Sequence, residues 1–268
     1  MTGYYRHANR QMVPPTGERT GFSAILPRGV THILSVYSIA FDDEKRLLAF
    51  SGLVSSIVYD FFVKSSGKSH MIDDLTGHLP FPILPSELYQ WIASRTLRLN
   101  CLTTHYADLW QECWDPAFAS DCFTKTDPRL GSWSHLTPEW HRHCAVRTPY
   151  ERRQCLVELD ALAALALNLT AEELCTIYRV QFPVLRMYER ETYYDQRGMI
   201  IFTTNRGLSG VGLDRKQFEE IKTTQRGDPL PDYATNYIPP FTRCDREQDM
   251  TQAYETFQKR LNGEGRAK

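Results

Sequence analysis

Apolar residues recur at helical spacing between Glu44 and Val63. Positions three to four residues apart lie on one face of an α-helix, so the pattern predicts a single amphipathic helix over this stretch. The repeat consists of Leu47, Phe50, Val54, Ile57, Val58 and Phe61. A second stripe consists of small residues that would let another backbone come close: Ser51, Gly52, Ser55 and Ser56.

A basic, flexible loop follows this helix, with the sequence Lys64-Ser65-Ser66-Gly67-Lys68-Ser69-His70. Gly67-Lys68-Ser69 looks like the end of a phosphate-binding P-loop. However, Phe62 stands where that motif requires a glycine, which excludes the interpretation. A short apolar segment over 71–79 then leads to Pro80-Phe81-Pro82.

Two strands are predicted before the helix. Phe22–Leu26 and Thr31–Phe41 are rich in apolar and β-branched residues. Pro27-Arg28-Gly29 between them is typical of a turn. Residues 1–20 are polar and basic, and two interpretations stay open: a solvated lead-in or part of a nucleic-acid-binding surface.

Helical patterns dominate the region after residue 85. Apolar spacing from Ser86 through Trp110 predicts one long helix of about 25 residues. Thr148 and Thr170 each open a capping box, with a glutamate three positions later, so a helix is predicted to begin at each. The first of these helices is predicted to stop near Asn168.

Two acidic residues of the first capped helix, Glu158 and Asp160, resemble metal-binding carboxylates. At helical spacing they stand about 200° apart and cannot share one ligand site, so we interpret them as charged surface positions. Further along, Met199–Thr203 predicts a short strand, and the glycines over 206–213 predict a turn. A last helix is predicted to begin at Asp245 and to end at Leu261.

These elements predict a mainly helical α+β fold. Residues 1–84 would form a small β-containing part with a long helix. Residues 85–268 would form a helical region with a short strand or hairpin and a long irregular loop over 111–147. His135, His141 and His143 in this loop match no strong zinc-binding pattern, so aromatic residues that anchor the loop to the core are the favoured interpretation.

Composition restricts the classes of function. The chain has 31 basic and 32 acidic residues and a net charge of −1, so any DNA-binding surface must be a local patch. Its seven cysteines form no CxxC pair, which predicts reduced thiols and a cytoplasmic location. No apolar run reaches the roughly 18 residues that span a bilayer, and no signal peptide is recognised at the N-terminus.

Residues 151–190 read ERRQCLVELDALAALALNLTAEELCTIYRVQFPVLRMYER. This block, together with Thr16–Thr20 and Tyr106–Trp110, resembles the C-terminal region of large adenine-N6 DNA methylases. These are the type IIG-like restriction–modification enzymes and the methylases of BREX- and DISARM-type phage-defence systems. The resemblance covers roughly Thr16 to Leu261 and implies the end of a DNA target-recognition domain followed by a helical scaffold.

The resemblance does not reach the catalytic part of that family. Adenine methylation requires an Asn/Asp-Pro-Pro-aromatic loop that holds the flipped base. Asp115-Pro116 and Asp127-Pro128 lack the second proline and the aromatic residue. The resemblance therefore implies a DNA-recognition and scaffold module that binds double-stranded DNA and acts with a methylase chain or another defence-system subunit. S-adenosylmethionine would be the cofactor of that partner, with none in this chain, and no membrane partner is expected.

Lys and Arg side chains contact phosphates, whereas polar side chains at loop tips read base edges. The candidate DNA-binding residues are Arg6, Arg10, Arg19, Lys64, Ser66, Lys68, Ser69 and His70. No catalytic or metal-binding residue is predicted. Two alternatives remain: a protein-interaction subunit or gene remnant without DNA binding, and an independent metal-dependent hydrolase that would use His141 and His143 or the carboxylates of 150–195.

Overall fold

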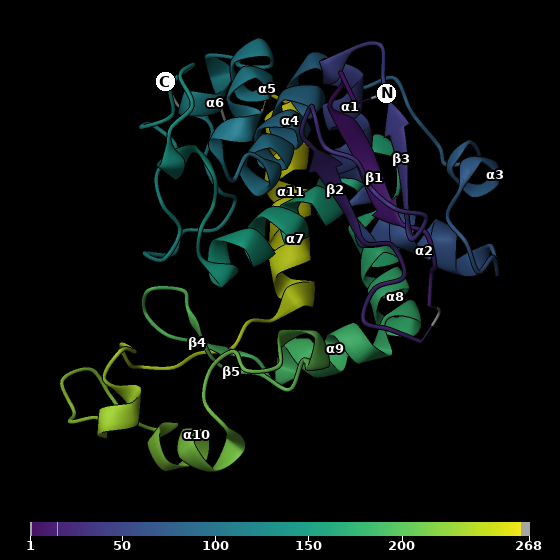
Figure 1. Cartoon of the computed structure of the whole chain (residues 1–268). Coiled ribbons are helices and arrows are strands. Elements are labelled where there is room, and N and C mark those ends of the chain that lie inside the picture. The colour runs from purple at the N-terminus through teal and green to yellow at the C-terminus, as the bar shows by residue number, and fades with distance from the viewer. Residues whose placement is uncertain (1, 15, 264–268) are drawn as a thin grey trace.

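The computed structural model describes residues 2–14 and 16–263 and has the mainly helical α+β fold that the sequence predicts (Figure 1). The strands are β1 (Arg6–Arg10), β2 (Ser23–Leu26), β3 (Val36–Ala40), β4 (Tyr193–Tyr194) and β5 (Ile200–Phe202). The helices of the first half are α1 (Glu44–Val54), α2 (Ile57–Ser65), α3 (Asp73–Thr76), α4 (Ser86–Asn100), α5 (Ala107–Glu112) and α6 (Ala117–Ser120). Those of the second half are α7 (Pro149–Ala166), α8 (Ala171–Gln181), α9 (Pro183–Arg190), α10 (Arg215–Ile221) and α11 (Arg246–Leu261). Short 3-10 turns occupy Thr104–Tyr106, Arg142–Cys144, Arg206–Leu208 and Asp232–Ala234.

The N-terminal sheet has the order β2-β1-β3, and both pairs are antiparallel. Its central strand is the polar segment Arg6–Arg10, so the interpretation of residues 1–20 as a solvated lead-in is wrong for this segment. Polar residues fit here because the inward side chains find partners. His7 Nδ1 lies 3.1 Å from Ser51 Oγ of α1, and Asn9 Nδ2 donates to the carbonyl of Met71 at 2.9 Å.

The predicted helix over Glu44–Val63 is two helices, α1 and α2, whose axes differ by 73°. The first ends at Val54 with Ser55 as its C-cap, and Ser56 caps the second, because the Ser56 hydroxyl accepts from the amide of Tyr59 at 3.3 Å. The first amide of α2, that of Ile57, donates to Asp160 Oδ1 at 2.8 Å. The prediction of one helix is therefore wrong, because a carboxylate distant in sequence stabilises the break.

The predicted long helix from Ser86 is also interrupted, since α4 ends at Asn100 and α5 begins at Ala107. The Asn100 side chain accounts for this end: Nδ2 donates to the carbonyl of Thr96 at 2.8 Å, and Oδ1 accepts from the amide of Ile25 at 2.9 Å. The small-residue stripe is the place where α4 approaches α1. A Cβ at Gly52 would stand 2.4 Å from Thr96 Oγ1.

Helix α7 lies at the centre of the helical body, between α4 and α11 (Figure 1). Glu158 and Asp160 are both fully buried on it, so their interpretation as surface positions is wrong. Arg95 Nε pairs with Glu158 at 2.6 Å, and Arg246 Nη2 pairs with Asp160 at 2.7 Å. The two carboxylates point to opposite sides of α7, and both are buried because neighbouring helices cover both of these sides.

Both predicted capping boxes are present, at Thr148 and at Thr170. The irregular region over 111–147 contains only short helical turns and is anchored by aromatic residues, as predicted. Trp110 and Trp133 are buried, and the indole of Trp110 donates to the carbonyl of Thr137 at 2.8 Å. The main hydrophobic core includes residues from both sides of position 84, from Tyr5 to Phe257.

A small C-terminal unit, residues 193–244, projects from the helical body (Figure 1). The predicted strand over Met199–Thr203 is present as β5, whereas α10 was not predicted. The unit has its own apolar cluster, formed by Ile201, Phe202, Phe218, Ile221, Ala234 and Phe241. Among the helices described, none is alone long and apolar enough to cross a membrane; the bent pair α1–α2 meets that criterion by length and composition only.

Candidate nucleic-acid interface

The N-terminal segment and the basic loop meet at one end of the sheet. Met12 forms an antiparallel bridge with His70, and the amide of Met71 donates to the carbonyl of Gln11 at 2.8 Å. Arg10, the last residue of β1, therefore lies close to the loop. We call Arg10, Ser66, Lys68, Ser69 and His70 the basic edge. All five are exposed.

The loop of the basic edge is held by short-range hydrogen bonds. Ser66 Oγ donates to the carbonyl of Val63 at 2.7 Å and accepts from the amide of Lys68 at 3.2 Å. Gly67 has φ +66°, a conformation that side chains disfavour, so glycine permits the turn. The hydroxyl of Ser69 and Nδ1 of His70 lie 2.9 Å apart. The loop thus presents polar side chains on a defined backbone.

The two cations of the basic edge differ in their partners. Within the described residues the guanidinium of Arg10 has no hydrogen bond or ion pair, whereas the ammonium of Lys68 pairs with Asp74. The hydrogen bond from Lys68 is the largest cause that lowers the pKa of the Asp74 carboxyl. Both members of this pair are well exposed, and exposed ion pairs are weak. A phosphate could therefore replace Asp74 at Lys68.

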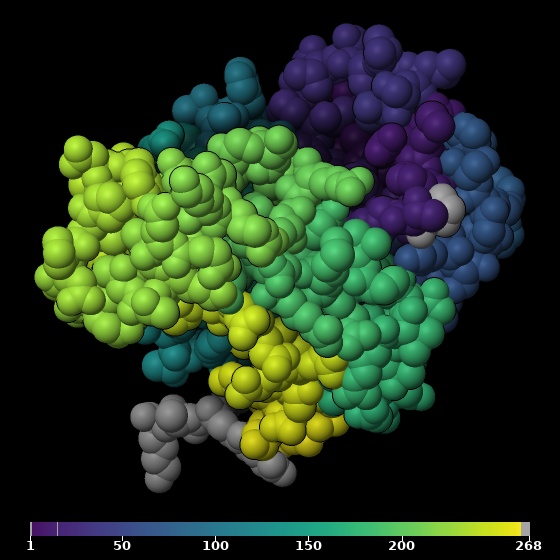
Figure 2. Space-filling model, turned by 90° about the horizontal axis from the view of Figure 1, so that it is seen from below, coloured from purple at the N-terminus to yellow at the C-terminus, as the bar shows by residue number. Residues whose placement is uncertain are grey.

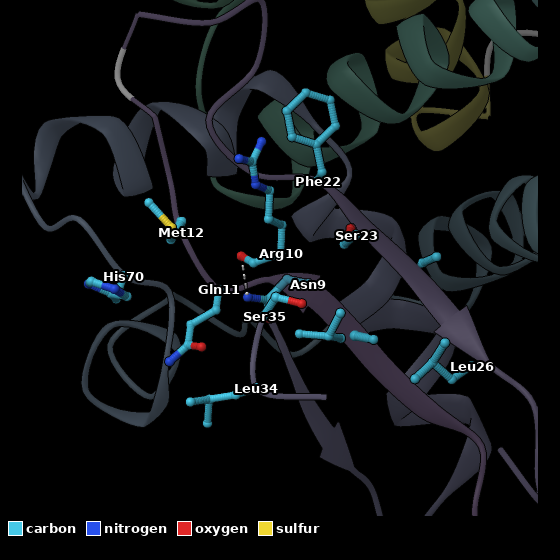
Figure 3. Close-up of a pocket in the computed structure, with 13 residues that line it drawn as sticks. Asn9, Arg10, Gln11, Met12, Phe22, Ser23, Leu26, Leu34, Ser35 and His70 are labelled. Atoms are coloured by element: carbon cyan, nitrogen blue, oxygen red, sulfur yellow. Dashed lines mark hydrogen bonds between the residues drawn. The ribbon is translucent and has the colours of Figure 1, made fainter. Parts of the chain in front are cut away.

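A groove of about 690 Å³ runs beside the basic edge over the outer face of the sheet (Figure 3). Its floor contains the small residues Ala8 and Ala24, and Arg10 and His70 belong to its lining. Figure 3 shows Phe22 and Leu34 among the side chains around it. These two side chains are 47% and 86% exposed, so the groove combines polar residues with unburied apolar ones.

The other three candidates serve the fold. Arg6 is only 3% exposed, and its Nη2 donates to the carbonyl of Val30 at 2.6 Å. Arg19 Nε pairs with the buried Asp60 at 2.6 Å. Lys64 donates to the carbonyl of Gln181 and lies 5.0 Å from the centre of the Phe182 ring. The structure therefore does not bring Arg6, Arg19 and Lys64 to the basic edge.

A second hollow, of about 650 Å³, separates the helical body from the C-terminal unit. We call it the cleft. On the face seen in Figure 2, the C-terminal unit comes close to the N-terminal segment. Asn205 Nδ2 donates to Glu18 Oε2 at 2.7 Å and joins the two sides. Arg152, Arg153 and Arg246 line the cleft together with aromatic and aliphatic side chains.

Two groups of side chains resemble catalytic arrangements. The rings of His135 and His143 lie 5.9 Å and 6.3 Å from that of His141, but no group of three or more metal-binding side chains is arranged to hold an ion in the described part of the chain. His7 and Ser51 form a hydrogen-bonded pair. Burial lowers the pKa of His7 to about 3, and because neither side chain reaches the surface we interpret the pair as structural.

Comparisons of the chain with protein-family models, with curated proteins and with solved structures found no match.

Sequence reasoning missed the groove and the cleft, because residues far apart in the chain form both. The residue types of β2, Ser-Ala-Ile-Leu, do not indicate the groove, because three consecutive positions are apolar. Only the structure shows that the buried Ile25 is flanked by the exposed Ala24 and the partly exposed Leu26, the alternation of a strand with one open face. No sequence feature indicates the cleft either, since its lining comes from loops, strand β2, four α-helices and both short C-terminal strands.

Proposed function

We propose that the chain is a DNA-recognition and scaffold module that acts in the cytoplasm with a separate adenine-N6 methylase of a restriction–modification or phage-defence system. One observation carries this proposal. Arg10 and the Lys68–His70 loop, selected separately from the sequence, lie together on one exposed edge beside a groove. The resemblance of 151–190 to the scaffold of such methylases supports the same function.

The residues of the basic edge have distinct roles in this proposal. Arg10 and Lys68 contact backbone phosphates, and Ser69 and His70 lie at the loop tip, where short polar side chains can read base edges. Ser66 holds the loop through its hydrogen bond to Val63. The helical body docks on the methylase chain, which supplies S-adenosylmethionine and the pocket for the flipped base.

DNA binding over a range of salt concentrations tests the proposal. Arg10→Ala/Lys68→Ala is expected to lower the slope of log affinity against log salt by about one to two units, because each phosphate contact contributes about 0.9. Lys216→Ala/Arg226→Ala is the matched control, because it removes two exposed cations from the C-terminal unit. Fluorescence anisotropy with a duplex of about 30 base pairs measures both slopes. Absence of salt-dependent binding, for the chain alone and with its methylase, overturns the proposal.

The chain alone is expected neither to bind S-adenosylmethionine nor to methylate DNA, because its sequence lacks the Asn/Asp-Pro-Pro-aromatic loop. Calorimetric titration with the cofactor measures this directly. Saturable one-to-one binding would contradict the division of work between the two chains.

One observation favours a second function, that of a protein-interaction subunit without a DNA role. Ile33 and Leu34 are 78% and 86% exposed, and Leu34 lines the groove. Exposed apolar groups of this kind occur at protein contacts. In that case Ile33→Ser/Leu34→Ser weakens capture of the methylase chain, and the chain shows no salt-dependent affinity for DNA.

A further inference from the structure

Three arginines lie close together at the start of α7 and in the turn before it. We call Arg142, Arg147 and Arg152 the arginine cluster. Arg147 Nε donates to the carbonyl of Arg142 at 2.9 Å, and Arg152 Nη1 donates to the carbonyl of Leu99 at 3.1 Å. The guanidinium of Arg142 makes no hydrogen bond or ion pair with the residues described. Each cation therefore has backbone carbonyls as partners, or none.

Within the described residues, no carboxylate forms an ion pair with the cluster. Glu151 lies in the first turn of α7, and its Oε2 accepts from the amides of Arg147 and Thr148, both at 3.3 Å. This carboxylate caps α7, and among the residues described it forms no ion pair within 4 Å. Burial, followed by the charges of Arg142 and Arg152, lowers the pKa of Arg147. Arg142 and Arg152 thus both repel Arg147, which the protein tolerates here.

Two buried arginines of the chain have carboxylate partners, unlike the cluster. Arg153 and Arg246 lie next to the cluster along the cleft, and each pairs with two carboxylates. Even so, Arg153 Nη2 and Arg246 Nε have no hydrogen-bond partner, although the two residues are only 6% and 4% exposed. Two arginines of the cleft lining therefore each keep a buried guanidinium N–H group that no group of the described chain satisfies.

We propose that the arginine cluster, with the adjoining part of the cleft, is a binding site for phosphate groups. Guanidinium groups bind phosphate oxygens through paired hydrogen bonds, and a bound dianion offsets the repulsion that Arg142 and Arg152 exert on Arg147. If the proposed function holds, the phosphates belong to the DNA backbone, and the cluster is a second contact that the basic edge does not supply. A free phosphate anion is the other source of the same chemistry.

The DNA source is tested with a matched pair of variants. Arg142→Gln/Arg147→Gln/Arg152→Gln is expected to lower the salt slope of duplex binding by about two to three units. Arg46→Gln/Arg179→Gln/Arg215→Gln removes the same charge from exposed arginines that have acidic partners, and is expected to leave the slope unchanged. If the wild-type chain binds DNA and both variants keep its slope, the cluster is not a DNA contact; the proposed function would survive.

Binding of inorganic pyrophosphate tests the phosphate site without DNA, so it distinguishes an error in this inference from an error in the proposed DNA function. Calorimetric titration is expected to show saturable binding to the wild-type chain and none to the cluster variant. This result without any DNA binding supports the phosphate site and overturns the DNA function. If pyrophosphate does not bind and the cluster variant keeps the wild-type slope for DNA, the inference is wrong.

Arg142→Glu tests the site in a variant that is expected to stay folded. The Arg142 guanidinium makes no hydrogen bond or ion pair within the described residues that could be lost, and the new carboxylate would lie near Arg147 as an internal anion. The melting temperature is expected to stay at or above the wild-type value, while pyrophosphate binding falls at least tenfold. Unchanged pyrophosphate binding in this folded variant would overturn the inference.

Discussion

Charged residues of the helical body and of the basic edge are organised in opposite ways. In the body, Arg95 is fully buried and lies between two carboxylates, those of Asp121 and Glu158. At the edge, Arg10 has no partner among the described residues, and Lys68 has one that is itself exposed. The buried, paired cations of the body thus stabilise packing, whereas those at the edge remain available to a ligand.

The difference shows why overall charge is a poor guide to the surface of this protein. The net charge of −1 counts buried pairs and exposed groups equally. A buried ion pair presents no net charge to an approaching ligand. Removal of the whole pair need not destabilise the fold, whereas loss of one member leaves an uncompensated buried charge. The exposed cations therefore identify candidate binding surfaces better than the total number of cations does.

The largest expected effect comes from breaking a buried pair. Glu158→Ala leaves Arg95 charged and buried and removes the acceptor of the Thr124 amide, so the free energy of unfolding should fall by about 3–5 kcal/mol. Urea denaturation measures the change. Glu172→Ala, which breaks the exposed pair with Arg179, is the control and should cost less than about 1 kcal/mol. Equal losses in the two variants would show that burial does not distinguish these pairs.

The next effect concerns His7, which is buried beneath the sheet. Its folded-state pKa of about 3 lies below the ordinary 6.5, so between these pH values only the unfolded chain binds the proton. This contribution to stability is complete above about pH 6.5 and is lost as pH falls, by about 3 kcal/mol between about pH 7 and about pH 4.

His7→Gln should remove that part of the pH dependence, as measured by urea denaturation at a series of pH values. His78→Gln is the control, because the His78 side chain is 81% exposed. A pH dependence in the His7 variant as steep as in the wild type would show that other groups dominate acid unfolding.

A smaller effect is expected at the start of α7. The Thr148 hydroxyl accepts from the amide of Glu151 at 3.2 Å, so Thr148→Ala should cost about 1 kcal/mol of unfolding free energy. Thr148→Ser keeps the hydroxyl and should cost less. If Thr148→Ala left the unfolding free energy unchanged, the hydrogen bond from the amide of Glu151 would not contribute to the stability of this helix start.

Thr148 also illustrates what the sequence could predict. A capping box needs partners only three residues apart, so both boxes, the last helix and strand β5 followed from local patterns. The break at Ser56 did not, because its stability depends on Asp160, which is 103 residues away from its partner Ile57. The end of α4 at Asn100 depends in the same way on Ile25.

The candidate site was predictable to a similar degree. Residue types identified Lys68, Ser69 and His70 as exposed loop positions, and the structure agrees on their exposure. Residue types did not show that Arg10 is exposed and Arg6 is buried, because both are arginines of the same strand. The carbonyl of Val30 holds Arg6 in the interior, and that contact comes from a loop 24 residues further along the chain. The arginine cluster was missed because its lack of acidic partners is a property of the folded chain.

The smallest effect compares two single cations that the sequence treats alike. Arg10→Gln should lower the salt slope of DNA binding by about one unit, which is about a fourfold change in relative affinity between about 50 and 200 mM salt. Lys64→Gln should leave the slope unchanged, because Lys64 already donates to the carbonyl of Gln181 and lies over the Phe182 ring. Its effect should instead appear as a small loss of melting temperature. Anisotropy and thermal unfolding of the same two variants measure both properties. If the two substitutions lowered the slope equally, the number of cations would decide DNA affinity, and the contrast between the body and the basic edge would lose its functional meaning.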